Sequence, residues 1–244
     1  MLIVLAAALG GGAGLLAPRS IYRLSVATGE PWRTACPRGH PLPRGAAGGW
    51  IGAATCRKAG CGPYGPTAGA TSVAAALIAA LLAAATGWRP ELLVWLLLTP
   101  GAVVLAAVDH RVHRLPDILT LPMAGTTLTL LALASVQPSH HGSFATAALG
   151  APAVALGLLV QFLIYPRGLG LGDCKLGLLT GAVLGWYGWK VLIVGTALGF
   201  AFGALWGCAL LLTRRADRQT SLAFGPLLLL SALLGVLLGA SDGL

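Results

Sequence analysis

Two aspartates stand out in this sequence as residues that could do chemistry. Asp109 ends a long apolar run, and Asp173 lies between a glycine-rich stretch and another apolar run. Carboxylates at a membrane are costly and are usually kept for function. Two carboxylates at one depth can share a proton, so that one activates a water while the other polarises a carbonyl. Such a pair can hydrolyse a peptide bond without a metal or a nucleophilic side chain.

The stretch around Asp173, GLGLGDCKL (168–176), is compatible with that chemistry. Gly170 and Gly172 add no side-chain bulk, so they predict an access loop through which a substrate backbone can approach Asp173. We expect Lys175 to support the acid from two residues away. A phosphate-binding loop is excluded, because a dinucleotide motif needs glycine at position 173 and a Walker motif needs Gly-Lys-Ser or Gly-Lys-Thr.

Each acid also has a structural interpretation. A lone aspartate at a helix end is often an N-cap or a solvated loop residue. Capping competes seriously at Asp173, which begins an apolar run, and less so at Asp109, which ends one. We interpret Asp117, just after Pro116, as an N-cap. The basic side chains near Asp109 are assigned to lipid head groups or membrane topology: His110, Arg111, His113 and Arg114.

The composition indicates which elements position these acids. Of 244 residues, 57% are hydrophobic and only 9% are charged, whereas soluble domains average about 25% charged residues. A water-soluble fold is therefore excluded, and an all-α polytopic membrane bundle is expected. Apolar runs of near-spanning length predict about eight transmembrane helices: 1–17, 69–86, 91–108, 118–135, 143–165, 174–189, 191–213 and 221–240.

The net charge of +9 could indicate a nucleic-acid partner, but its distribution indicates a membrane. Of the 16 Lys and Arg residues, 14 lie on the odd-numbered loops and two on the other side. The positive-inside rule then puts the odd loops in the cytoplasm and both termini outside, with lipid and no nucleic acid as partner. No charge precedes the first run, so we expect a retained helix rather than a signal peptide. The cytoplasmic group is Arg19, Arg23, Arg33, Arg38, Arg44, Arg57, Lys58, Arg111, Arg114, Arg167, Lys175, Arg214, Arg215 and Arg218; the other is Arg89 and Lys190.

The first cytoplasmic loop, 18–68, contains too few apolar residues to build a core unaided. It carries Cys36 and His40 four positions apart, and Cys56 and Cys61 five apart. Three thiols and one imidazole could form a tetrahedral zinc site that staples the loop. Unligated reduced cysteines remain the alternative, and structural disulfides are not expected in the cytoplasm.

Several stretches together resemble the prepilin peptidases, a branch of the membrane aspartyl proteases. GLGLGDCKL (168–176) resembles their G-x-G-D motif with its trailing lysine and leucine. DHRVHRLPDILTLP (109–122) resembles the family's other aspartate segment. GLLAPRSIYRLS (14–25) and FGP (224–226) are similar to segments near the first and last spans. The match follows the family order along nearly the whole chain.

The resemblance implies that Asp109 and Asp173 form the catalytic dyad of an integral membrane aspartyl endopeptidase. Such enzymes remove positively charged leaders from type IV prepilin or pseudopilin-like precursors at the cytoplasmic face of the plasma membrane, and peptidase activity needs no cofactor. The expected organisation is a first transmembrane helix (1–17), a cytoplasmic loop with a zinc-stapled subdomain (18–68) and a membrane peptidase domain (69–244).

The residues leave two alternatives open. Bifunctional family members also methylate the new amino terminus with S-adenosylmethionine, and they usually carry two C-x-x-C pairs and an acidic residue near the second span. Here residues 66–77 contain no acid and the cysteine spacing is wider, so S-adenosylmethionine is expected only if that activity is retained. The alternative function is a small transporter or channel that binds a cation at its membrane-edge aspartates. A structural or assembly subunit would leave the paired acid motifs without a role.

Overall fold

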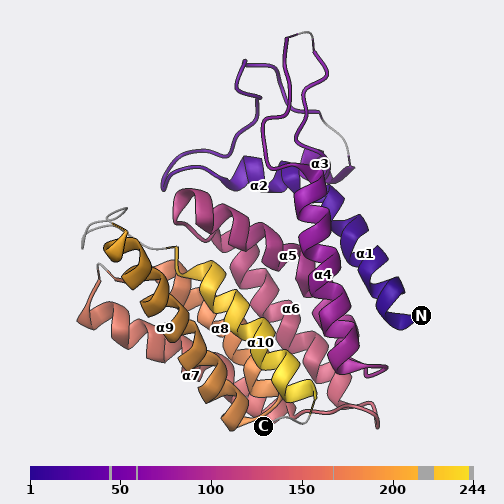
Figure 1. Cartoon of the computed structure of the whole chain (residues 1–244), viewed down its shortest axis with the longest axis vertical. Helices are drawn as coiled ribbons and strands as arrows, with labels where there is room; N and C mark the ends of the chain where they lie inside the picture. The colour runs from indigo at the N-terminus through magenta and orange to yellow at the C-terminus, as the bar shows by residue number, and fades with distance from the viewer. Residues whose placement is uncertain (44–45, 59, 167, 214–222, 242–244) are drawn as a thin grey trace.

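The computed structural model of the chain describes residues 1–43, 46–58, 60–166, 168–213 and 223–241, and their regular secondary structure is almost entirely helical (Figure 1). The helices are α1 (Leu2–Leu16), α2 (Pro18–Leu24), α3 (Ala46–Gly49), α4 (Ala68–Thr86), α5 (Glu91–Val112), α6 (Asp117–Ser135), α7 (Phe144–Ile164), α8 (Leu171–Trp186), α9 (Trp189–Leu212) and α10 (Gly225–Ala240). Some basic residues used for the topology lie outside the described residues: Arg44, Arg167, Arg214, Arg215 and Arg218.

The expected all-α membrane bundle is confirmed, and each of the eight predicted segments corresponds to a helix, α1 or one of α4 to α10. One shift in a boundary is functionally relevant. The predicted segment 174–189 begins at Leu171 in the structure, so Asp173 lies within the first turn of α8 rather than before it.

The lengths of the helices support fewer membrane crossings than eight. Five of the described helices, α4, α5, α6, α7 and α9, are long and apolar enough to cross a membrane, and the bent pair α1–α2 would make six. Helices α8 and α10 have 16 residues each, which is shorter than the usual span of about 20. Leu93, Leu163 and Leu205 expose 62–67% of their surface, as expected for side chains that face hydrocarbon. The chain is a multi-pass membrane protein.

Small residues allow the helices to approach closely. A Cβ on Gly181 in α8 would lie 2.9 Å from the carbonyl carbon of Gly150 and 3.0 Å from Cα of Ala151, both in α7. A Cβ on Gly10 in α1 would lie 2.6 Å from the backbone oxygen of Ala75 in α4. Such contacts replace the hydrophobic driving force that is missing between helices in lipid. They fix α8, and therefore Asp173, against its neighbours.

The 18–68 loop sits at one end of the bundle, away from both the start of α1 and the end of α10 (Figure 1). The chain bends by 43° between α1 and α2. Ile21 and Leu24 of α2 then pack against Val104 and Val108 in the last turns of α5. The bend therefore seats the loop over the end of α5 that carries Asp109.

Candidate active site

Asp109 lies in the last full turn of α5, where the helix is about to end. His113 ends α5 in a left-handed conformation (φ 48°, ψ 46°) and donates its backbone N–H to the Asp109 carbonyl over 2.8 Å. The Asp109 side chain is only 4% exposed. Its Oδ2 accepts a hydrogen bond of 3.0 Å from the backbone N–H of Gly225, the first residue of α10. The carboxylate is thus held between two helix ends.

Asp173 is the third residue of α8 and is 7% exposed. Its Oδ2 accepts a hydrogen bond of 2.9 Å from the backbone N–H of Gly170, and its own N–H donates to the Gly170 carbonyl over 3.0 Å. The N-cap of α8 is Gly170, and Asp173 is the third helical residue, whose side chain accepts from the N-cap backbone as in a capping box. The same contacts fix its carboxylate, and the positive end of the helix dipole favours a negative charge there.

Both carboxylates line one cavity of about 460 Å³. The structure therefore brings together the two acids predicted from the sequence, which are contributed by α5 and α8. Gly170, Gly172 and Lys175 line the same cavity. Two buried carboxylates facing one solvent-accessible space can act as an acid and a base on a single substrate group.

The glycines before Asp173 do more than leave space for a substrate. A Cβ on Gly172 would lie 3.0 Å from Cβ of Leu115, in the segment that follows α5. Gly170 supplies the N–H that holds Asp173. The absence of side chains therefore lets the start of α8 lie directly against the segment beyond Asp109, which brings the two acids to the same cavity.

Lys175 does not contact Asp173 as expected but pairs with Asp117. Its Nζ lies 2.6 Å from Asp117 Oδ2, and both side chains are partly exposed. The interpretation of Asp117 as an N-cap was wrong, because the N-cap of α6 is Pro116 and Asp117 is the first helical residue. The ion pair joins the starts of α6 and α8 across the rim of the cavity. No spacing rule in the sequence could have paired these two residues.

The basic residues after Asp109 also differ from expectation. Arg114, assigned to lipid or topology, donates from Nη1 to the backbone oxygen of Ala27 over 2.8 Å and to that of Val26 at 3.5 Å. It ties the first loop to the aspartate segment. Arg114 and His113 line the cavity with the two acids, whereas His110 lines a different, mostly apolar cavity between α4, α5, α8 and α10.

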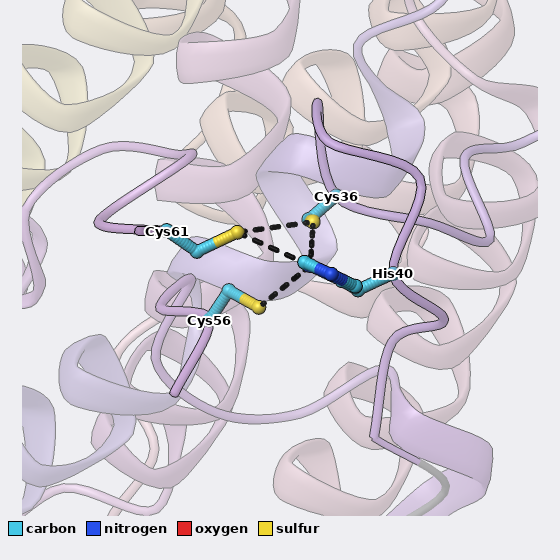
Figure 2. Close-up of side chains that lie close together, drawn as sticks. All are labelled: Cys36, His40, Cys56 and Cys61. Atoms are coloured by element: carbon cyan, nitrogen blue, oxygen red, sulfur yellow. Dashed lines mark hydrogen bonds between the residues drawn. The ribbon is translucent and has the colours of Figure 1, made fainter. Parts of the chain in front are cut away.

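The four predicted metal ligands of the first loop lie together (Figure 2). The His40 Nδ1 atom lies 3.2 Å from the Cys61 sulfur, 3.6 Å from the Cys36 sulfur and 3.7 Å from the Cys56 sulfur. The Cys36 and Cys61 sulfurs are 3.9 Å apart. With Zn–S of about 2.3 Å and Zn–N of about 2.0 Å, a tetrahedral site has edges of about 3.5–3.8 Å. The four donors fit such a site.

Two short turns present these ligands. An isolated β-bridge between Ala35 and Pro41 encloses Cys36 and His40, and another between Thr55 and Pro63 encloses Cys56 and Cys61. The wider spacing, compared with two C-x-x-C pairs, therefore still converges on one point. None of the five cysteines, all within the described ranges, forms a disulfide, and the remaining two lie away from the cluster: Cys174 in α8 and Cys208 in α9.

The cluster also alters thiol acidity. Burial raises the pKa of Cys36, but backbone hydrogen bonds from Arg38 and His40 and side-chain hydrogen bonds with His40 and Cys61 outweigh it and lower the pKa from 9.0 to about 6. Burial, and then hydrogen bonds with Cys56 and Cys36, raise the pKa of Cys61 to about 11. At neutral pH the metal-free cluster thus already holds one thiolate, the form that binds metals.

Comparisons with known proteins identify a family that matches the sequence. The sequence model of the type IV leader peptidase family matches residues 96–241. Relatives named prepilin leader peptidase/N-methyltransferase include one from Pseudomonas aeruginosa, 32% identical over 175 residues, which cover 68% of this chain and 57% of the relative. One from Pseudomonas putida is 33% identical over 172 residues, which cover 66% of this chain and 56% of the relative. One from Aeromonas hydrophila is 33% identical over 174 residues, which cover 67% of this chain and 55% of the relative. The chain spans about half the length of the curated relatives it matches, and no solved structure matches it.

Proposed function

Because this chain belongs to the type IV leader peptidase family, we propose that it is an integral membrane aspartyl endopeptidase. Its substrates are type IV prepilin or pseudopilin-like precursors, from which it removes the leader peptide. One observation carries the proposal: Asp109 and Asp173, both buried, face one cavity and are each held by a backbone N–H. This cavity is the proposed active site.

The chemistry needs the two carboxylates in opposite protonation states. The ionised carboxylate takes a proton from a water whose oxygen bonds to the scissile carbonyl carbon, while the protonated one donates its proton to the carbonyl oxygen. As the tetrahedral intermediate collapses, the C–N bond breaks and the carboxyl that took the proton from water gives it to the leaving nitrogen. A hydroxyl proton of the intermediate returns to the other carboxylate, which restores the starting protonation states. Gly225 and Gly170 contribute by fixing the carboxylate oxygens, so that little reorganisation is needed during the reaction.

We propose that this reaction takes place at the cytoplasmic face of the plasma membrane. The seven Lys and Arg residues of the 18–68 loop, together with Arg111 and Arg114 beside Asp109, support this orientation, which places the amino terminus outside. Within it, residues 1–17 form a first transmembrane helix, 18–68 a cytoplasmic subdomain and 69–244 the membrane peptidase domain. The apolar helix of the precursor stays in the bilayer while its leader enters the active site.

In the subdomain, Cys36, His40, Cys56 and Cys61 would hold a structural zinc ion. A zinc ion bound by four protein ligands stabilises a fold but has no open position for catalysis. It would stabilise a loop whose buried apolar side chains are few. The peptidase chemistry itself rests on the two carboxylates and needs no cofactor.

The proposal covers the peptidase step alone. The relatives' names include an N-methyltransferase, but those proteins are longer than the matched part, and residues 66–77 here contain no acid. S-adenosylmethionine is therefore a cofactor of this protein only if an assay detects methylation of the new amino terminus. A cation transporter or channel, the alternative from another class, is not favoured by the family to which the chain belongs.

Co-expression with a pilin-like precursor tests the proposal. We expect the wild-type chain to shorten the precursor, seen as a mobility shift, and Asp109→Asn or Asp173→Asn to abolish the shift. Glu30→Gln, an exposed acid in the first loop, is the matched control and should leave cleavage intact. Precursors that stay uncut with the wild-type chain, or full cleavage by either aspartate variant, would refute the assignment.

A further inference from the structure

The first loop supplies part of the wall of the active-site cavity. Two residues from that loop, Thr28 and Trp32, line the cavity together with Asp109 and Asp173. Nothing in the spacing of the sequence indicated this, because Trp32 lies 77 positions before Asp109 in a segment of low apolar content. The cavity is thus closed on one side by a segment that does not belong to the membrane bundle.

Three exposed apolar side chains line this cavity. Trp32 is 39% exposed, Ile118 of α6 is 52% exposed and Leu171 of α8 is 53% exposed, and all three line the cavity. The remaining rim is polar and includes the Lys175–Asp117 ion pair. Apolar side chains that line the same cavity as two buried acids offer a surface that an apolar group of a substrate can cover.

Trp32 is held in place from several directions. Its ring meets that of Trp50 edge to face, with centroids 5.2 Å apart, and the guanidinium of Arg23 lies 4.1 Å above the Trp50 ring. The backbone N–H of Arg33 donates to the Arg23 carbonyl over 3.3 Å. Arg33 follows Trp32 in the chain. Before Trp32, the Ala27 carbonyl accepts a hydrogen bond from Arg114. A ring fixed in this way can position a substrate without a large entropic cost.

We propose that Trp32, with Ile118 and Leu171, forms an apolar subsite that receives a large apolar side chain of the precursor close to the scissile bond. Trp32 is a positioning residue, because it contacts the substrate side chain and leaves the proton transfers to the carboxylates. The inference rests on the proposed peptidase function and adds to it a determinant of substrate selectivity, supplied by the first loop.

The test compares precursor variants rather than activity alone. In detergent, steady-state cleavage is measured for two forms of one pilin-like precursor, which carry either a large apolar residue or alanine beside the scissile bond. An apolar pocket contact is worth about 10- to 200-fold in discrimination. We expect Trp32→Ala to lower kcat/KM by about tenfold or more for the precursor with the large apolar residue, mainly through KM, and by less than about threefold for the alanine precursor. Trp32→Phe should retain most of the activity.

Two further variants keep the result interpretable. Ile118→Ala changes the subsite from α6 rather than from the loop and leaves Trp32 in place, and it should show the same selectivity. Trp88→Ala, at an exposed tryptophan between α4 and α5, should change neither precursor. Equal losses for both precursors, or no loss in either subsite variant, would overturn the subsite. Absence of cleavage by the wild-type chain would overturn the peptidase assignment together with it.

Discussion

The backbone N–H of Gly225 donates a hydrogen bond of 3.0 Å to the Asp109 carboxylate, although the two residues are 116 positions apart. Gly225 begins α10, and Asp109 lies near the end of α5. The positive end of the α10 dipole therefore faces the acid, which offsets part of the cost of burying a carboxylate. This contact fixes one oxygen of Asp109 and leaves the other for chemistry.

Gly225→Ala should impair cleavage strongly, because a Cβ at this position would lie 2.8 Å from Asp109 Oδ2 and 3.2 Å from its Cγ. The carboxylate would have to move, and a shift of about 1 Å in a catalytic group can cost about a hundredfold in rate. We expect kcat to fall at least about tenfold, measured with purified protein and a pilin-like precursor.

The matched control is Gly157→Ala in α7, where a new Cβ would meet nothing within 4 Å. That variant should cleave as the wild type does. Wild-type kcat in Gly225→Ala would mean that the position of Asp109 Oδ2 does not matter for the reaction.

The Lys175–Asp117 ion pair predicts an energetic coupling between the starts of α6 and α8. Lys175→Ala and Asp117→Ala should each lower cleavage by a few fold, because the starts of α6 and α8 lose a contact of 2.6 Å at the cavity rim. Both side chains are partly exposed, so the coupling should be small, about 0.2–1 kcal/mol in a double-mutant cycle.

Exchange of the two charges, Lys175→Asp with Asp117→Lys, should restore part of the lost activity. Lys190→Ala, at an exposed residue of α9, serves as the control. Additive losses in the double variant would show that the pair has no joint role.

Much of the architecture could be predicted from the sequence, because hydrophobic run length is a strong signal for membrane helices. Each predicted span is a helix, and Asp109 and Asp173 face one cavity. What could not be predicted depends on distant contacts. The partner of Lys175, the cavity wall formed by Trp32 and the amide of Gly225 are set by how the helices and the first loop pack, and no local pattern records them.

The start of α8 illustrates the same limit. Hydropathy identifies an apolar run but not the residue at which its helix begins. Helix α8 begins at Leu171, where the Gly170 N–H donates to the Asp173 carboxylate. The metal cluster gives the opposite case. The cysteine spacing left unligated thiols as an alternative to a zinc site. Two turns, each closed by a single β-bridge, nevertheless bring the four donors to one point: Cys36, His40, Cys56 and Cys61.

The loop cluster predicts a bound metal that depends on its thiols. Purified wild-type protein should contain about one zinc ion per chain by elemental analysis, since structural sites bind tightly. Cys56→Ser should lose it and lower the thermal stability of the loop. Cys208→Ser, at an exposed thiol on α9 outside the cluster, should retain the metal. A metal-free wild type with an intact loop would exclude the zinc site.

After the metal is removed by chelation, the pKa of Cys36 should lie below the ordinary thiol value and that of Cys61 above it. The lowered pKa of Cys36, about 6 instead of 9.0, means that its thiolate stabilises the folded loop above pH 9; this contribution declines from pH 9 to pH 6 and is lost below. Rates of alkylation followed by mass spectrometry should have a midpoint near pH 6 for Cys36 and near pH 11 for Cys61. Identical midpoints near pH 9 would contradict the described hydrogen bonds.

The close contact of α7 and α8 predicts a stability effect separate from catalysis. Gly181→Ala would place a Cβ 2.9 Å from the carbonyl carbon of Gly150, and overpacking of this kind costs about 1–3 kcal/mol. We expect a lower thermal midpoint for the detergent-solubilised protein. Gly125→Ala in α6, where nothing lies within 4 Å, should melt like the wild type or slightly higher. An unchanged midpoint for Gly181→Ala would show that the helices are packed less closely.

The catalytic pair is tested most directly by cleavage with purified protein and intact-mass analysis of the products. A pilin-like precursor is incubated with the wild-type chain, Asp109→Asn, Asp173→Asn or Glu30→Gln, each checked for folding by thermal melting. We expect a leader and a shortened pilin with the wild type and Glu30→Gln, and an uncut precursor with either aspartate variant. Products of the same mass from Asp109→Asn or Asp173→Asn would contradict the assignment of these two carboxylates as the catalytic pair.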